Sequence, residues 1–214
     1  MLVADYIYLH GFASSPQSTK SQKLRSYLQT YKVELKIPDL NQGDFSHLTL
    51  SRQIQQVEAL FPLAPTPVVL IGSSFGGLTA AVLAQRNLQV QRLVLLAPAF
   101  GFQEYWLSQL SAAELQQWQS SGYLGVYHYG EKRTIPMHYQ FIQDFLQYQG
   151  EQLQRSLPTL ILHGRYDQTI PITASRKYAS ERPWVQLLEL DSDHSLTDVI
   201  PAICEATSSF CKLF

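Results

Sequence analysis

Residues 68–84 read VVLIGSSFGGLTAAVLA, and this stretch decides the fold class. The apolar run 68–71 has the composition of a buried strand, and residues 78–84 have that of a helix. Between them, residues 72–76 form a Gly-x-Ser-x-Gly pentapeptide. The pentapeptide alone is weak evidence, but a serine at a sharp strand-to-helix turn is the arrangement of a nucleophile elbow. Ser74 is therefore the leading candidate for a catalytic nucleophile.

Short apolar runs alternate with helix-like segments along most of the chain. The expected strands are 4–9, 32–37, 68–71, 92–96, 159–162 and 185–190. The expected helices are 19–30, 48–60, 75–85, 172–180 and 196–211. This alternation is typical of an α/β fold in which a mostly parallel sheet carries helices on both faces. We expect a sheet of about six strands.

One segment, residues 101–150, interrupts the alternation and is rich in aromatic residues; we call it the insertion. We expect helical pieces at 104–110 and 112–120, a hairpin turning at Gly130-Glu131, and a helix over 136–148. A position between two core strands favours a lid over the sheet, with Trp106 and Tyr139 as candidate pocket residues. The alternative is that the aromatics only pack the insertion against the rest of a single domain, 1–214.

Length, charge and cysteine content narrow the function classes. A chain of 214 residues suits one domain with a large core. A net charge of −1 gives no electrostatic reason to expect nucleic acid, and no apolar run reaches the length of a membrane span. The first residues do not resemble a secretory signal, so we expect a cytoplasmic protein. Cys204 and Cys211, two helical turns apart, suit buried thiols rather than a disulfide. The sequence leaves the oligomeric state open.

A serine nucleophile needs a histidine base, and the base needs an orienting acid. In this type of fold the order along the chain is Ser, Asp or Glu, then His, with the partners in loops that follow strands. Asp167 follows the strand expected at 159–162, and His194 follows the strand expected at 185–190. These two are the expected acid and base. We expect His163 to pack inside or to bond the backbone near Asp167.

An oxyanion hole is also required, because negative charge develops on the former carbonyl oxygen of the substrate. One donor is expected to be the backbone N–H of Phe75, the residue after the nucleophile. The second is expected from the loop after the first strand, His10-Gly11-Phe12, at the N–H of Phe12. We expect His10 to brace this loop.

Three further motifs accompany the pentapeptide: YLHGFASSPQSTK at 8–20, HGRYD at 163–167 and SDH at 192–194. Together they resemble the α/β-hydrolase superfamily over essentially the whole chain. Within it they resemble the small YqiA-like bacterial esterases and the mitochondrial acyl-thioesterase branch, which hydrolyses S-acylated proteins and acyl glucuronides. The resemblance implies the triad Ser74, Asp167 and His194. We expect the sheet to lack the antiparallel strands that usually come first, which gives a minimal α/β-hydrolase fold.

Two function hypotheses follow. The first is a serine hydrolase that cleaves carboxylic esters or thioesters of small molecules through an acyl-enzyme, with no metal and no organic cofactor. The alternative is a non-catalytic or receptor-like protein that binds small molecules on the same scaffold. A serine at position 74, rather than aspartate or cysteine, argues against dehalogenase and dienelactone-hydrolase chemistry.

Overall fold

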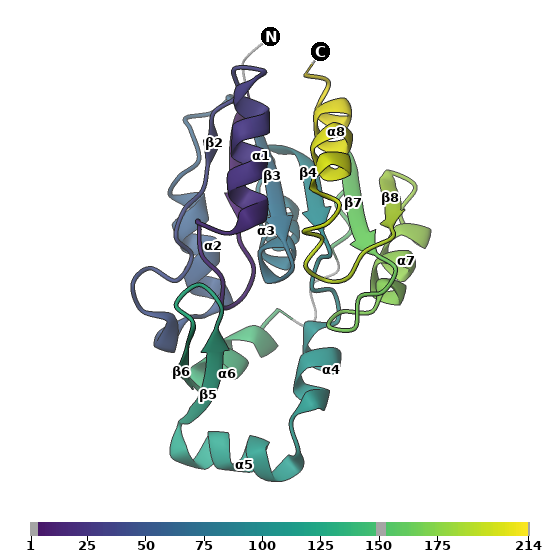
Figure 1. Ribbon diagram of the computed structural model, residues 1–214. Coiled ribbons are helices and arrows are strands. Elements are labelled where there is room, and N and C mark those ends of the chain that lie inside the picture. The colour runs from purple at the N-terminus through teal and green to yellow at the C-terminus, as the bar shows by residue number, and fades with distance from the viewer. Residues whose placement is uncertain (1–3, 149–152, 214) are drawn as a thin grey trace.

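A six-stranded parallel sheet forms the centre of the computed structural model, which describes residues 4–148 and 153–213 (Figure 1). The order across the sheet is β2-β1-β3-β4-β7-β8. The strands are β1 (Asp5–Leu9), β2 (Leu35–Lys36), β3 (Val68–Ser73), β4 (Val90–Leu96), β7 (Thr159–Gly164) and β8 (Val185–Leu190). Every pairing in this sheet is parallel, so the expected six-stranded parallel sheet is confirmed.

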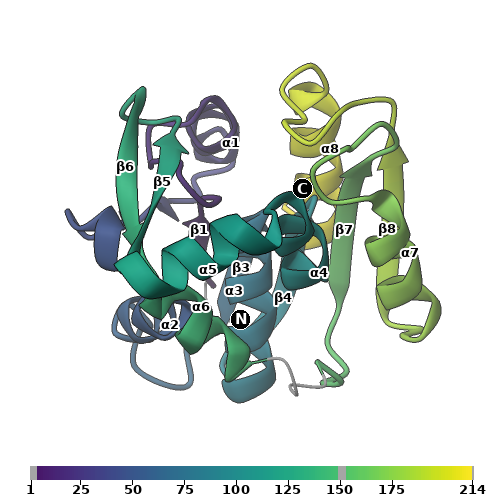
Figure 2. The same cartoon turned by 90° about the horizontal axis from the view of Figure 1, so that it is seen from below.

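Helices cover both faces of the sheet, as expected (Figures 1 and 2). They are α1 (Thr19–Gln29) and α8 (Ile200–Cys211) on one face, and α2 (Leu50–Glu58), α3 (Phe75–Arg86) and α7 (Ile172–Ser180) on the other. Successive strand residues point to opposite faces. In β3, Val68 and Leu70 belong to the core on the α2–α3 side, and Val69 and Ile71 belong to the core under α1 and α8. Burial on both faces explains why the strands read as continuous apolar runs.

The strand order reverses beside β1. The chain passes from β1 to β2 at one edge and then returns to β3 on the other side of β1. In open α/β sheets, ligands bind beyond the carboxyl ends of the strands at this kind of reversal. Leu9 at the end of β1 pairs with Gly72 in β3. The topology therefore puts the loop 10–12 next to Ser74.

Two core elements are shorter than expected. Strand β2 contains only Leu35 and Lys36, because Lys32 adopts a left-handed conformation with φ +60° in the turn that leaves α1. Helix α8 begins at Ile200 rather than at residue 196. Leu196 has φ +54°, which a right-handed helix excludes, and Pro201 suits the first turn because it has no N–H to pair.

The insertion lies beyond the carboxyl ends of the strands (Figures 1 and 2). It consists of α4 (Phe102–Trp106), η2 (Leu107–Gln109), α5 (Ala112–Ser121), β5 (Tyr123–His128), β6 (Arg133–His138) and α6 (Gln140–Leu146). Strands β5 and β6 form an antiparallel hairpin around the turn expected at Gly130-Glu131. The prediction of a helix over 136–148 is wrong about where the helix begins. Pro136 belongs to β6, where Ile135 and Met137 alternate inward, and the helix begins at Gln140.

Helix α7 holds the segments on both sides of the insertion. Phe100, just before it, stacks on Tyr178 with ring centroids 4.1 Å apart and an interplanar angle of 16°. The Arg182 guanidinium lies 4.0 Å from the centroid of the same Tyr178 ring, and its Nε donates to the carbonyl of Leu153, just after the insertion. One aromatic–cationic stack therefore fixes both stems of the insertion. Farther along, the Arg155 guanidinium donates to the carbonyls of Ala84 and Asn87 at the end of α3.

The start of α3 packs directly against the end of β1, backbone against backbone. A Cβ atom on Gly76 would overlap the carbonyl oxygens of Leu9 and His10. Neither of these can move, because both belong to the end of a central strand and its loop. Position 76 therefore requires glycine, because only a residue without a Cβ lets the start of α3 lie this close to the end of β1.

The substitution Gly76→Ala is expected to lower the free energy of unfolding by about 3 kcal/mol or more, because overpacking here meets backbone rather than flexible side chains. Gly43→Ala is the control. Gly43 has φ +71° but no atom within 4 Å of a built Cβ, so it is expected to lose only about 1 kcal/mol from backbone strain. Urea unfolding of both variants measures the difference, and equal losses would contradict the packing argument.

Candidate active site

Ser74 occupies a strained turn between β3 and α3. Its φ of +52° and ψ of −117° lie outside the regions that residues other than glycine normally adopt. The turn is held from several sides: the Ser74 N–H donates to Leu96 O at 2.9 Å, and the Ser74 carbonyl accepts from Gly77 at 2.9 Å and from Ala99 at 3.0 Å. The strand–turn–helix context that the sequence predicts for Ser74 is therefore present.

A hydrogen-bonded chain connects Ser74, His194 and Asp167. The Ser74 hydroxyl lies 3.0 Å from His194 Nε2, and His194 Nδ1 donates to Asp167 Oδ2 at 2.6 Å. His194 lies in the loop after β8, and Asp167 in the loop after β7. The structure brings together all three residues that the sequence predicts for a triad.

The Asp167 carboxylate has no exposed side-chain surface and accepts four hydrogen bonds. The backbone N–H groups of Thr169 and Ile170 donate to Oδ1, both at 2.8 Å, and two imidazoles donate to Oδ2. Burial acts to raise the pKa of Asp167, but the hydrogen bonds from His163, His194 and Ile170 outweigh it. The pKa therefore lies well below its usual range, and the carboxylate is ionised at neutral pH.

His163 is the second imidazole on Asp167, and it is fully buried in β7. Its Nε2 lies 3.0 Å from Asp167 Oδ2 and 2.9 Å from the carbonyl of Ile170. A carbonyl only accepts, so Nε2 carries the hydrogen and Nδ1 accepts from the Ser175 hydroxyl at 2.8 Å. The sequence placed His163 near the Asp167 loop but did not predict this bond. The i,i+4 spacing in HGRYD was the available signal.

Lys20, in the first turn of α1, is a further charged group near the triad. Burial lowers its pKa to about 8, while the carboxylates of Asp167 and Asp193 act in the opposite direction. The sequence offered no reason to single it out beyond its place at the end of the motif 8–20.

The two expected oxyanion donors lie at the junction between β1 and α3. A Cβ built on Gly11 would lie 3.4 Å from the Ser74 Cβ, so the loop 10–12 passes close to the serine. Among the described residues, no protein acceptor takes a hydrogen bond from the N–H of Phe12 or Phe75. Both groups are therefore available to a ligand.

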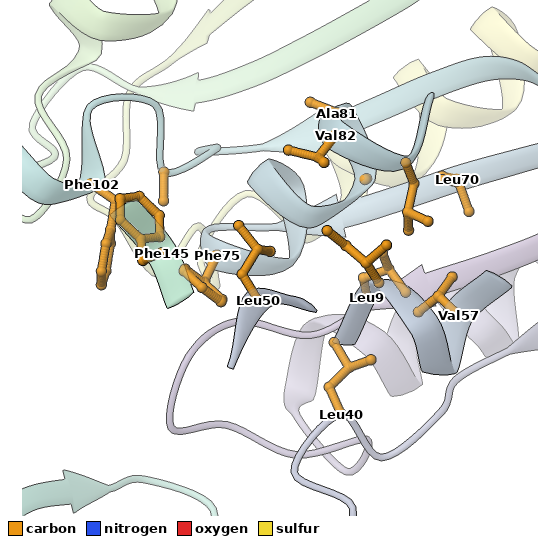
Figure 3. Packing of buried hydrophobic residues seen from close by; sticks show 14 of the residues in the cluster. Leu9, Leu40, Leu50, Val57, Leu70, Phe75, Ala81, Val82, Phe102 and Phe145 are labelled. Atoms are coloured by element: carbon orange, nitrogen blue, oxygen red, sulfur yellow. The ribbon is translucent and has the colours of Figure 1, made fainter. Parts of the chain in front are cut away.

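An aromatic cluster connects these two residues to the insertion. The Phe12 ring lies 5.2 Å from Phe141 and 5.7 Å from Trp106, and the Phe75 ring lies 5.2 Å from Phe102. Figure 3 shows Phe75, Phe102 and Phe145 side by side. Of the two expected pocket residues, Trp106 stacks on Phe102, whereas Tyr139 packs against Trp118.

Two cavities flank the site. The larger, of about 780 Å³, lies between α3, α7 and the insertion, and its lining includes Leu78, Phe100, Tyr105 and Phe145. It contains no triad residue, and neither Trp106 nor Tyr139 lines it. The smaller, of about 470 Å³, borders His194 and is lined also by Tyr166, Gln168, Thr169 and Asp193.

The described ranges, 4–148 and 153–213, contain no group of three or more His, Cys, Asp or Glu side chains suited to a metal ion. Within the same ranges, no helix is both long enough and apolar enough to cross a membrane.

Solved structures with the same architecture include several hydrolases. A putative hydrolase from Agrobacterium vitis S4 superposes with a TM-score of 0.84 at 23% identity, covering 97% of this chain and 87% of the other. Alpha/beta hydrolase domain-containing protein 10 from mouse gives 0.79 at 21% identity, covering 98% and 90%. Est1E from Butyrivibrio proteoclasticus, bound to ferulic acid, gives 0.77 at 17% identity, covering 99% and 90%. At these identities the likeness establishes the fold alone.

The sequence itself identifies the family. No curated protein sequence matches the chain. The pattern of the uncharacterised protein family UPF0227, however, matches residues 5–211, which is nearly the whole length. This confirms the resemblance to the YqiA-like group that the motifs predicted. The chain therefore has a minimal α/β-hydrolase fold and belongs to the uncharacterised protein family UPF0227.

Proposed function

We propose that this protein is a serine hydrolase that cleaves carboxylic ester or thioester bonds of small molecules. The observation that carries the proposal is the chain of hydrogen bonds from Ser74 through His194 to the buried Asp167 carboxylate, with distances of 3.0 and 2.6 Å. A strained serine that is aligned with a base and an ionised acid is suited to nucleophilic attack, which ligand binding alone does not require. The arrangement favours catalysis over the receptor-like alternative.

In the proposed reaction the Ser74 Oγ attacks the acyl carbon while His194 Nε2 takes the hydroxyl proton. The Asp167 carboxylate stabilises the imidazolium that forms, and the hydrogen bond from His163 keeps Asp167 in place. The N–H groups of Phe12 and Phe75 stabilise the oxyanion of the tetrahedral intermediate. His194 then gives its proton to the leaving alcohol or thiol, and water hydrolyses the acyl-enzyme by the same route.

The neighbouring structures support this reaction class. Est1E binds ferulic acid, and two further neighbours are pyrethroid hydrolases. The cavity of about 470 Å³ beside His194 suits the leaving group, because His194 must protonate it. The cavity of about 780 Å³ offers aromatic side chains for an acyl group, and four of these come from the insertion: Phe102, Tyr105, Phe145 and Tyr148. We assign the insertion as a lid over the site on this basis.

Substitution of the triad tests the proposal. Ser74→Ala, His194→Ala and Asp167→Asn are each expected to lower kcat/KM roughly 10⁴-fold on a p-nitrophenyl ester, with the fold retained. The double variant Ser74→Ala/His194→Ala is expected to be little worse than the worse single variant, because triad residues act as a unit. Covalent labelling by a fluorophosphonate probe is expected to disappear in Ser74→Ala. An active Ser74→Ala protein, or strictly additive losses, would contradict the assignment.

The pKa of Asp167 predicts a pH signature in stability. Because the folded protein lowers this pKa, the ionised carboxylate stabilises the fold fully above the unfolded pKa of about 3.9, and this contribution is lost as the pH falls below it. The difference in the free energy of unfolding between wild type and Asp167→Asn is therefore expected to be largest above about pH 5 and to shrink toward pH 3. Urea titrations across this range measure it. A difference that grows on acidification would contradict the hydrogen-bond network described for Asp167.

Acyl-chain preference tests the lid. If the insertion supplies the acyl pocket, kcat/KM should rise with chain length by about 0.8 kcal/mol per buried CH₂, and Tyr105→Ala should flatten that rise. The sequence named Trp106 and Tyr139 for this pocket, so their alanine variants form the second arm. Their ring contacts predict a loss of thermal stability with the chain-length profile kept. An unchanged profile in all three variants would mean that the insertion only packs against the domain.

A further inference from the structure

The loop that presents the Phe12 N–H has unusually well-fixed carbonyl groups. The Gly11 carbonyl accepts from His10 Nδ1 at 2.9 Å, and His10 Nε2 in turn accepts from the Leu40 N–H at 3.0 Å. Gly11 C=O and Phe12 N–H belong to the same planar peptide group. The hydrogen bond from His10 therefore also fixes the direction of the Phe12 N–H.

A second fixed carbonyl lies two residues later and is held from the insertion. Ala13 O accepts from the N–H of Tyr129 at 2.8 Å and from the N–H of Gly130 at 3.4 Å, both in the turn between β5 and β6. Ala13 is buried and has φ +52°, a left-handed conformation that is unfavourable for a residue other than glycine. Such a conformation persists only where external contacts hold it. For Ala13, those contacts come from the hairpin.

His128 anchors this end of the hairpin. It is 1% exposed, packs edge-on against Phe45 at a centroid distance of 4.7 Å, and its Nδ1 accepts from the Glu131 N–H at 3.1 Å. The last bond closes the turn that carries the N–H groups of Tyr129 and Gly130. Burial lowers the pKa of His128, although the Glu131 carboxylate acts to raise it, so the ring is neutral with its hydrogen on Nε2.

The surroundings of His128 Nε2 show which part of the His128 side chain stabilises the hairpin. Nε2 is buried, and among the described residues it has no hydrogen-bond partner. A buried N–H without an acceptor is destabilising, so Nε2 does not stabilise the fold. What His128 contributes is its shape against Phe45 and the acceptor at Nδ1.

We propose that His128 is a positioning residue for the oxyanion hole: through the hairpin turn it holds the Ala13 carbonyl, and so the Phe12 N–H, in the geometry that the tetrahedral intermediate needs. The inference rests on the proposed function. It deepens that proposal, because it makes the insertion part of the catalytic geometry as well as a cover for the substrate. His10 holds the Gly11–Phe12 peptide within the core, and the insertion holds the Ala13–Ser14 peptide, so the residues Phe12 and Ala13 lie between these two fixed peptide groups.

The test separates the acceptor of His128 from its shape. His128→Phe keeps the ring but removes the acceptor for Glu131, whereas His128→Asn keeps an acceptor near the position of Nδ1. We expect His128→Phe to lower kcat about tenfold with KM nearly unchanged, because a displaced oxyanion donor costs less than the 10²–10³-fold of a deleted one. We expect His128→Asn to stay within about threefold of wild type.

His138→Phe is the matched control. His138 Nδ1 also accepts a backbone N–H, that of Gln140 at 3.2 Å, but His138 lies at the other end of the hairpin beside His47 and Tyr123. His138 is only half-buried, so this variant should lose less stability than His128→Phe, and it should keep kcat within about twofold.

A trifluoromethyl ketone provides the readout that a purely structural role would not change. Its tetrahedral adduct with Ser74 uses the oxyanion hole, so its Ki should rise in His128→Phe by about the factor by which kcat/KM falls. In the ¹H–¹⁵N spectrum, the adduct should shift the Phe12 amide proton downfield in wild type and less in the variant. An unchanged Ki with a lowered kcat/KM, or an equal loss in His138→Phe, would overturn the proposal.

Two further outcomes are distinguishable. If His128→Phe does not fold, replacing Tyr129 by its α-hydroxy acid analogue removes the shorter of the two hydrogen bonds to the Ala13 carbonyl and leaves the longer one from Gly130. A rise in Ki is again expected, and an unchanged Ki would overturn the proposal. If wild type neither hydrolyses a p-nitrophenyl or thioester substrate nor binds the ketone, the proposed function itself is wrong and this inference falls with it.

Discussion

Two direct backbone contacts bring the loops of the candidate site together. Gly76 lets α3 begin against the last carbonyls of β1, and Gly164 lets the end of β7 lie against the carbonyls of Ser192 and Asp193. The first contact brings Ser74 beside the loop 10–12, and the second brings the His194 loop over Asp167. A side chain at either glycine would push these loops apart, because its Cβ would overlap a backbone oxygen at both Gly76 and Gly164. The relative positions of Ser74, Asp167 and His194 are thus set by backbone packing at the ends of the strands rather than by contacts among their own side chains.

The sheet and the proximity of Ser74, Asp167 and His194 could be predicted from the sequence because both depend on local signals. A buried parallel strand reads as an apolar run, and the residues of the triad lie in loops whose order along the chain is set by the topology. The start of α8 was predicted four residues too early. Leu196 adopts a left-handed conformation, so the loop that carries His194 continues past it and the helix begins only at Ile200. The helix expected from Pro136 was wrong because pairing with Gly125 overrides local preference. The i,i+4 spacing of His163 and Asp167 was a signal for their bond, but the bond itself depends on the side-chain conformations of both residues.

The insertion contacts the proposed oxyanion hole through both side chains and backbone. The side chains of Phe12 and Phe75 pack among insertion aromatics, while their N–H groups stay available near Ser74. The hairpin turn bonds the backbone one residue beyond Phe12. Edge-to-face and offset aromatic contacts each contribute about 0.5–1.5 kcal/mol beyond the area they bury, so the cluster resists displacement as a whole. The insertion therefore contacts the loop 10–12 and the residue after it through both aromatic side chains and backbone hydrogen bonds.

The stack of Phe100, Tyr178 and Arg182 makes the insertion a replaceable module. The chain leaves the core and returns to it at the same helix, so the segment between can change in length or sequence while both stems keep their place. Evolution can then vary the insertion without rebuilding the sheet. The same property gives a protein engineer two defined junctions, at Phe100 and Leu153, for grafting an insertion from a relative. Any graft must keep one feature, a turn that donates to the Ala13 carbonyl.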